Sequence, residues 1–182
     1  MTTQCSACVP FHNTPIAGVN PCGLQPNDIW QMDVTHLPST GKLKYTHVSV
    51  DTSSKVVFAS LHSGEKMKDV IVHCLLAFAY MGLPNVIKTD NGPTYTGGKF
   101  QTFCVNNNIK HITGIPYNPT GQAIVERMHM VIKQYFTKIN RGEYILSPNT
   151  QLASILFILN FLTVDCEGYS AMERHWKKVL SP

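Results

Sequence analysis

The sequence predicts an α/β protein with one mixed β-sheet and helices on its faces. Three short runs rich in β-branched and aromatic residues follow one another over residues 29–61, separated only by short turns, as in an antiparallel meander. From residue 65 on, helical patterns alternate with further strand-like runs, an order typical of a sheet covered by helices. The chain has 182 residues, of which 43% are apolar. That is enough for one buried core.

The first 28 residues are expected to form an extended tail or linker. They show no helix or strand periodicity and contain four prolines. Cys5 and Cys8 have the C-x2-C spacing of half a zinc site. Two thiols cannot close a tetrahedral site, and the spacing to His12 and Cys22 fits neither a zinc finger nor a zinc knuckle. Bound zinc is therefore not expected.

The first predicted strand carries an acid. The three strand-like runs are Ile29–Thr35, Tyr45–Asp51 and Val56–Leu61. In the first run Trp30, Met32 and Val34 share one face, which leaves Asp33 on the other face beside Gln31. Burying a carboxylate without a partner is costly, so Asp33 is expected to line a cleft.

The rest of the folded domain, expected to end at residue 178 before a short tail over 179–182, alternates helices with strands. The predicted order is a helix over 65–81, a strand over 86–89, a helix over 98–106, a strand over 110–113, and helices over 122–140, 149–161 and 170–176. Between the last strand and the next helix, prolines and glycines predict a mobile loop over 114–121 that borders the functional site.

The helix over 122–140 has two separable faces. One is an apolar stripe that includes Val125, Ile132 and Phe136 at helical spacing. The other carries Glu126 and, two turns later, Lys133. A cation in that position can hold a phosphate of a nucleic acid that runs past the acid.

Three acids stand out from the solvated ones. Asp33 lies inside a strand, Asp90 lies where a strand enters Asn-Gly-Pro, and Glu126 lies just inside a helix. Such positions can meet at one point of an α/β fold, where three carboxylates repel one another unless cations neutralise them. The sequence therefore predicts a divalent-metal site. Asp51, at a strand end before Thr-Ser-Ser, is instead expected to accept hydrogen bonds in a turn.

Other chemistries find little support. None of the eight histidines pairs with another at the helical spacing of a metal motif, although His129 is one position off the acidic helix face and can reach the site. Walker, dinucleotide and Gly-x-Ser-x-Gly motifs are absent. The longest aliphatic run has five residues, so no membrane span is expected, and reduced thiols are expected because no secretory signal follows Met1. The net charge of +4 permits nucleic-acid binding without demonstrating it.

Several linked motifs resemble the catalytic core of retroviral integrases. They are WQMDVTH, KTDNGPTY and IPYNPTGQAIVERMH, and the 35 residues between Asp90 and Glu126 match the D,D-35-E signature of that family. ILFILNF and SAMERHW are similar to motifs of betaretroviral integrases, including their endogenous relatives. The resemblance covers about residues 20–176, nearly the whole predicted fold.

This resemblance implies an RNase H-like fold with a five-stranded sheet and a polynucleotidyl transferase that processes DNA 3′ ends and joins strands. Two Mg²⁺ or Mn²⁺ ions would be held by Asp33, Asp90 and Glu126. Tyr117, Gln122 and Lys133 match positions that contact DNA. The implied partners are viral and target DNA and a second copy of the core. The implied location is the nucleus or cytoplasm, or the virion if the chain is part of a viral polyprotein.

Departures from the family leave two hypotheses open. Cys5 and Cys8 look like the second half of the family's H-x3-H and C-x2-C zinc domain, whose histidines this sequence lacks, and the family's SH3-like domain is not expected within this sequence. Met130 stands where many relatives have a basic or polar residue that contacts DNA. The chain is thus either a weak integrase core or a non-catalytic module that dimerises or binds nucleic acid. A DDE transposase or an RNase H-type nuclease fits the linked motifs less well.

Overall fold

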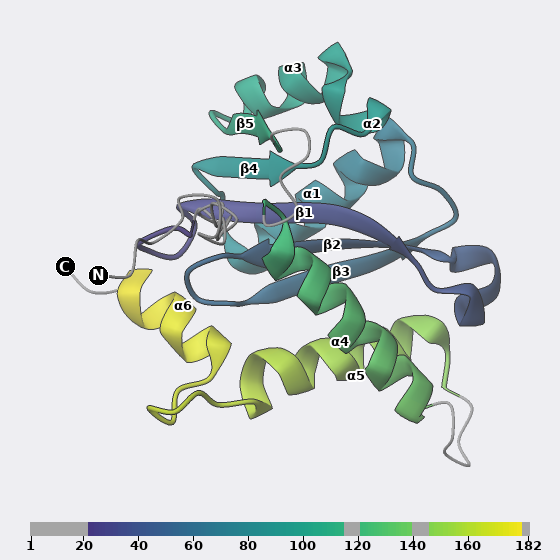
Figure 1. Ribbon diagram of the computed structural model, residues 1–182, viewed down its shortest axis with the longest axis vertical. Coiled ribbons are helices and arrows are strands. Elements are labelled where there is room, and N and C mark those ends of the chain that lie inside the picture. The colour runs from purple at the N-terminus through teal and green to yellow at the C-terminus, as the bar shows by residue number, and fades with distance from the viewer. Residues whose placement is uncertain (1–21, 115–120, 140–145, 180–182) are drawn as a thin grey trace, which may run out of the picture.

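The computed structural model describes residues 22–114, 121–139 and 146–179, which form a central sheet with helices on both faces (Figure 1). The strands are β1 (Ile29–His36), β2 (Tyr45–Asp51), β3 (Val57–His62), β4 (Val86–Thr89) and β5 (Lys110–Thr113). The helices are α1 (Met67–Met81), α2 (Pro93–Thr96), α3 (Gly98–Asn106), α4 (Ala123–Ile139), α5 (Pro148–Phe157) and α6 (Ala171–Val179). A 3-10 segment, η2 (Pro38–Leu43), and a π-helical turn, η3 (Ile158–Leu162), complete the described elements.

The sheet is mixed and has β1 at its centre. Its strand order is β3-β2-β1-β4-β5. The first three strands pair antiparallel, which confirms the predicted meander. β4 then runs parallel to β1, and β5 runs parallel to β4. A parallel neighbour needs a crossover connection, and α1 supplies it between β3 and β4.

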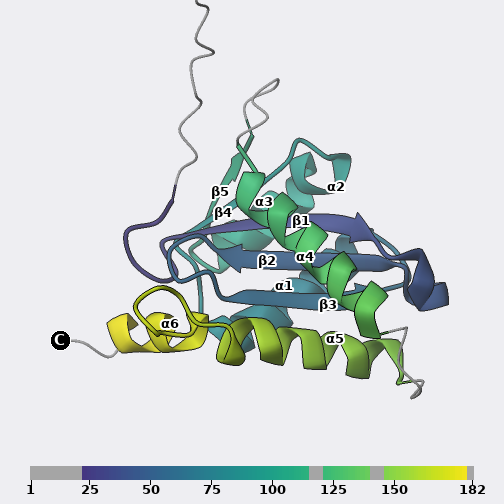
Figure 2. The ribbon, with the colours of Figure 1, turned by 60° about the horizontal axis from the view of Figure 1, so that its bottom comes forward.

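Helices cover the two faces of the sheet separately: α4 and α5 lie on one face, α1 and α3 on the other (Figures 1 and 2). The apolar stripe predicted for α4 is confirmed, since Val125, Ile132 and Phe136 are buried against β2, β3 and α5. Cys74 of α1 and Cys104 of α3 are buried on the opposite face, where they pack as small core residues. No helix in the described part of the chain is long and apolar enough to cross a membrane.

Asp51, the last residue of β2, ties both ends of the described chain to the sheet. As predicted, its carboxylate accepts a hydrogen bond in the following turn, from Ser54 Oγ at 2.9 Å. It also accepts one from the backbone N–H of Asn27 at 3.1 Å, so residues expected in the tail are bonded to the domain. From α6, the ring of His175 lies 3.0 Å from Asp51 through Nδ1 and 2.7 Å from the carbonyl of Met81 through Nε2.

The end of α5 differs from the sequence prediction of one continuous helix to residue 161. The α-helix stops at Phe157 and continues as the π-helical turn η3. This turn places the side chain of Asn160 against the edge of β3, where its amide accepts from the N–H of Val57 at 2.9 Å and donates to the carbonyl of Val57 at 2.7 Å. A pattern of apolar spacing does not encode such a bond.

Candidate active site

Asp33 lies near the middle of β1, the central strand of the sheet. Its side chain is 25% exposed, and its Oδ1 accepts a hydrogen bond from the N–H of Val34 at 2.8 Å. Its neighbours in the strand, Met32 and Gln31, are buried. The carboxylate is therefore held on the central strand of the sheet, at the edge of a cleft, as the sequence predicted.

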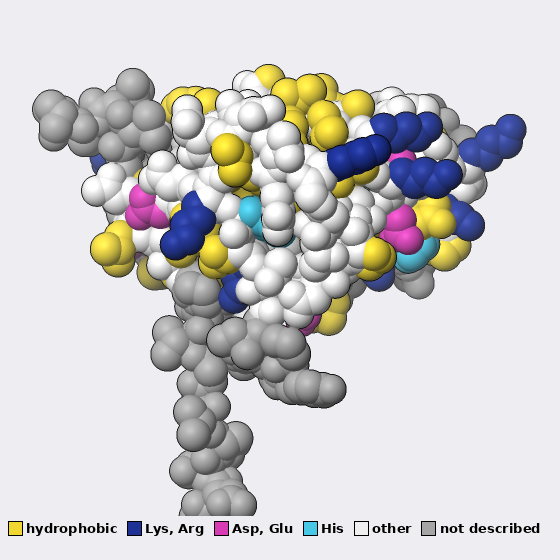
Figure 3. Space-filling model, turned by 90° about the horizontal axis from the view of Figure 1, so that it is seen from above, with side chains coloured by type: hydrophobic (Ala, Val, Ile, Leu, Met, Phe, Trp, Pro, Cys, Tyr) yellow, Lys and Arg dark blue, Asp and Glu magenta, His cyan; other side chains and the backbone are white. Residues whose placement is uncertain are grey.

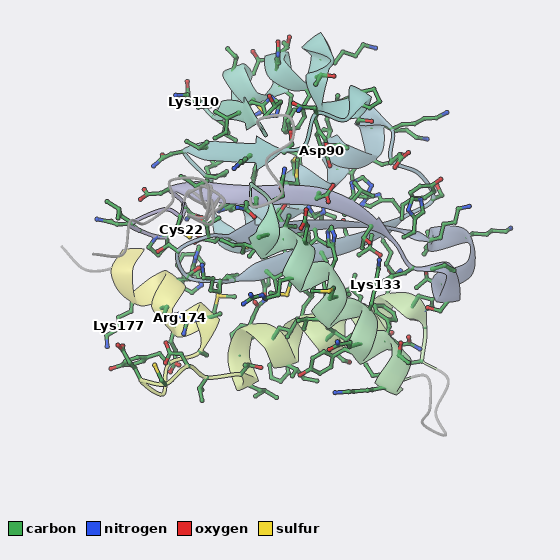
Figure 4. All side chains as sticks on the ribbon, in the orientation of Figure 1. Cys22, Asp90, Lys110, Lys133, Arg174 and Lys177 are labelled. Atoms are coloured by element: carbon green, nitrogen blue, oxygen red, sulfur yellow. The ribbon has the colours of Figure 1, made fainter. Side chains whose placement is uncertain are left out.

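Asp90 follows the end of β4 and comes level with Asp33. The parallel register of β1 and β4 pairs Gln31 with Lys88. Two residues later along each chain, the same register places Asp33 beside Asp90. The Oδ1 atom of Asp90 accepts a hydrogen bond from the N–H of Gly92 at 2.9 Å. This hydrogen bond orients the carboxylate of Asp90, which lies where the chain leaves the sheet after β4 (Figure 4).

Glu126 is exposed in the first turn of α4, which starts in front of β1 and below the end of β4 (Figure 1). The start of this helix is fixed by Gln31, whose Oε1 accepts from the N–H of Val125 at 3.2 Å. The Nε2 of Gln31 donates to the carbonyl of Gly121 at 3.4 Å. Sequence reasoning missed this role of Gln31, although its place on the same strand face as Asp33 was the available signal.

The three acids share one electrostatic site. Burial is the main reason that the pKa of Asp33 is raised to about 6; the hydrogen bond from the N–H of Val34 opposes this shift, and the charges of Asp90 and Glu126 add smaller increases. The described residues contain no group of three or more His, Cys, Asp or Glu side chains that could hold a metal ion as they stand. The donor set nevertheless suits Mg²⁺ or Mn²⁺, because carboxylate oxygens are the ligands these ions prefer and a cation would relieve the repulsion.

A cavity of about 190 Å³ opens beside two of these acids. Its lining includes two residues that sequence reasoning did not single out for the site, Glu65 before α1 and Tyr95 of α2. Thr94 Oγ1 donates to the carbonyl of Glu65 at 3.1 Å and so joins the two segments. The lining residues are Asp33, Val34, Glu65, Asp90, Gly92, Pro93, Thr94 and Tyr95.

His129 reaches the site, as its position in the sequence suggested. Its Nδ1 lies 3.9 Å from Oδ2 of Asp33. Burial, and then the charge of Lys133, lower the pKa of His129 to about 4. The ring is therefore neutral at pH 7 and forms no ion pair with Asp33. Its Nε2 is buried without a hydrogen-bond partner among the described residues.

The predicted DNA contacts fall in different places. Lys133 is exposed on the outward side of α4, further along the helix than Glu126 (Figure 4). Gln122 precedes α4, and both polar atoms of its side-chain amide are buried without a partner among the described residues. Tyr117, Cys5 and Cys8 lie outside the described residues.

The strand order and the placement of the acids define an RNase H-like fold of the integrase type. Comparison with known proteins agrees. A sequence profile of the family described as "Integrase core domain" matches residues 23–119. The catalytic core domain of HTLV-2 integrase, solved in complex with magnesium in a dimeric form, is 36% identical and superposes with a TM-score of 0.75. That match covers 84% of this chain and 99% of the HTLV-2 chain.

The chain therefore belongs to the integrase core domain family, as a retroviral integrase catalytic core of betaretroviral type. It is 52% identical over 175 residues to the Gag-Pro-Pol polyprotein of Sheep pulmonary adenomatosis virus. It is 47% identical over 194 residues to the Intracisternal A-particle Pol-related polyprotein of mouse. These matches cover 95% and 99% of this chain, but only 10% and 22% of the two polyproteins.

Proposed function

We propose that this domain is a divalent-metal-dependent polynucleotidyl transferase that trims DNA 3′ ends and joins them to target DNA. The observation that carries the proposal is that Asp33 and Asp90 line one cavity, while the charge of Glu126 also acts on Asp33. The three acids come from a central strand, the end of its parallel neighbour and the start of a helix, yet the charges of Asp90 and Glu126 both raise the pKa of Asp33. Related integrases carry out DNA integration, and one homologous core is solved with magnesium.

In this proposal the three carboxylates hold two Mg²⁺ or Mn²⁺ ions. Bound ions would supply Lewis-acid activation of the attacking oxygen and neutralisation of charge on the leaving oxygen. The protein itself would contribute by holding the three carboxylates in position. β1 fixes Asp33, the N–H of Gly92 orients Asp90, and Gln31 holds the start of the helix that carries Glu126.

Two reactions follow from one site. With water as the nucleophile, a P–O bond to water forms, the P–O bond to a 3′ oxygen breaks, and the DNA end is trimmed. With a DNA 3′-hydroxyl as the nucleophile, one phosphodiester forms as another breaks, and two DNA molecules become joined. Neither reaction needs an oxidant, a reductant or an energy-rich cosubstrate.

DNA would approach the site along α4. Lys133 is exposed on the same side of this helix as Glu126, which suits a phosphate contact. The side-chain amide of Gln122, just before the helix, is without a partner among the described residues. Seen from the end of the molecule that carries α2 and α3, Lys and Arg side chains gather mainly on the right of the view (Figure 3). Such cations can neutralise a DNA backbone.

We also propose that the domain forms a homodimer, as a homologous core does. Val72, Leu75 and Leu76 form an exposed apolar stripe on α1, each about half exposed. The stripe borders a groove of about 420 Å³ between α1 and α5 over β3. A second copy would cover this apolar surface.

Sedimentation should show a dimer that Leu76→Glu converts to monomer, whereas Val105→Glu, at an exposed site on α3, should remain dimeric.

The decisive experiment incubates the protein with a labelled DNA duplex in Mg²⁺ or Mn²⁺ and measures shortened and joined strands. Glu126→Gln should abolish both products, because it removes one of the three carboxylate ligands while keeping the size of the side chain. Glu167→Gln, at an exposed acid before α6, is the matched control and should react like wild type. A folded wild-type protein that gives no products with either ion would favour the non-catalytic alternative.

A further inference from the structure

The hydroxyl of Tyr95 is a buried polar group without a hydrogen-bond partner among the described residues. Tyr95 lies in α2, is only 4% exposed, and lines the cavity beside Asp33 and Asp90. Its ring packs edge-on against Phe100, with the ring centroids 5.4 Å apart. An unpaired hydroxyl in such a place is costly, since it has given up water without gaining another acceptor.

The surroundings of this hydroxyl are negative. Burial, and then the charges of Asp33, Cys74, Asp90 and Glu65, raise the pKa of Tyr95 well above its usual value. The phenol therefore stays protonated and can act only as a hydrogen-bond donor toward these acids. It lines a cavity that also holds Asp33, Glu65 and Asp90, yet donates to none of the described groups.

The hydroxyl of Tyr95 lacks an acceptor, and the carboxylate of Asp33 has acceptor sites that no described donor occupies. Its Oδ1 is engaged by the N–H of Val34, while its Oδ2 has His129 Nδ1 only at 3.9 Å, beyond hydrogen-bond distance. A carboxylate has about four acceptor sites. When a carboxylate binds a cation, a second donor commonly fixes its orientation.

We propose that Tyr95 is a positioning residue, whose hydroxyl donates to Asp33, directly or through one water in the cavity, when a divalent cation binds the acids. The inference rests on the proposed function and adds a residue to it. Phenylalanine would fill the same space without leaving a polar group unpaired. The hydroxyl thus does not stabilise the metal-free fold, and we assign its hydrogen bond to the metal-bound state.

Removing only the hydroxyl tests this role. Tyr95→Phe should melt at the same temperature as wild type, or higher, in the absence of metal. In the presence of DNA, its Mn²⁺ affinity, measured by calorimetry, should fall on the order of tenfold, the usual effect of losing such an outer partner. Tyr80→Phe is the matched control, because the hydroxyl of Tyr80 accepts from Asn160 Nδ2 at 3.3 Å, outside the acid site. It should leave Mn²⁺ affinity unchanged.

A spectroscopic measurement on the wild-type protein does not depend on the variant folding. With ¹³Cζ-labelled tyrosine, added Mg²⁺ should shift the resonance of Tyr95 and leave that of Tyr80 in place. Equal Mn²⁺ affinity in wild type and Tyr95→Phe, or a Tyr95 resonance that Mg²⁺ does not move, would overturn this inference while leaving the metal site intact. If wild type with DNA binds no more Mn²⁺ than Asp90→Asn, the proposed function fails, and this inference fails with it.

Discussion

Gly92 leaves no room for a side chain beside the carboxylate of Asp90. A Cβ atom at this position would lie 2.9 Å from Oδ1 and 3.4 Å from Oδ2 of Asp90. The backbone of Gly92 is in a conformation open to other residues, so the restriction comes from the neighbouring carboxylate alone. A side chain at position 92 would therefore displace the carboxylate of Asp90 rather than the backbone.

We therefore expect Gly92→Ala to separate stability from function. The change in unfolding free energy should stay below ~1 kcal/mol, because a carboxylate at the surface can swing aside. Mn²⁺ affinity and DNA joining should fall at least tenfold, because the swing moves a proposed metal ligand. Gly98→Ala is the control, since no atom lies within 4 Å of a Cβ there. Unchanged Mn²⁺ affinity in Gly92→Ala would mean that Asp90 is not held by this turn.

Among the elements, α4 depends on β1 for its starting point. The N–H of Val125 is one of the helix-terminal donors that no helical carbonyl can satisfy. Gln31 satisfies it from the neighbouring strand, in a fully buried position. The same contact sets where Glu126 enters the site, so one glutamine links the helix to the strand that carries Asp33.

Gln31→Leu should cost ~1–3 kcal/mol of stability, because it leaves the N–H of Val125 buried and unpaired. DNA joining should fall by more than this loss of folded protein explains, since Glu126 is no longer fixed. Urea unfolding and the joining assay, read at a temperature where both proteins are folded, separate the two effects. Gln134→Leu, at an exposed position of the same helix, should change neither. Equal joining by folded Gln31→Leu and wild type would refute the link.

Periodic elements were predictable, and contacts between elements were not. The meander, α1, α3 and the two faces of α4 follow from local spacing, which the chain shows directly. The short helices η2 and α2 begin at prolines and are too brief to show a period. The candidate acids Asp33, Asp90 and Glu126 were predicted from their segments and motifs, and the fold places Asp33 and Asp90 in the lining of one cavity. Glu65 and Tyr95 were missed because only the fold brings them to the cavity.

For the whole molecule, we expect a histidine cluster between the sheet and α1 to lower stability in acid. His47 of β2, His62 of β3 and His73 of α1 lie together. The ring centroid of His47 is 4.6 Å from that of His62 and 5.6 Å from that of His73. Burial lowers the pKa of His47 to about 4 and that of His73 well below its usual value. Asp69, the nearest acid, opposes the shift at His47 and His62.

Stability should consequently fall as the pH drops from about 6.5 toward 4. The unfolded chain takes up protons at its histidines near 6.5, whereas the buried rings of the native state do not. Each pKa unit is worth ~1.4 kcal/mol, so His47 alone, which is 1% exposed, accounts for about 3 kcal/mol at most. Urea unfolding at pH 7 and pH 5 should show a smaller difference in His47→Gln. The exposed His36, changed to Gln, should preserve the full difference.

The two ends of the described fold meet at one carboxylate. Asn27 and His175 both bond to Asp51, and Cys22, Arg174 and Lys177 are labelled on the same side of the molecule in Figure 4. Polypeptide attached before the first strand and after the last helix would thus leave from one corner. Two such flanking parts would be near neighbours by covalent connection alone. They could meet each other without crossing the sheet.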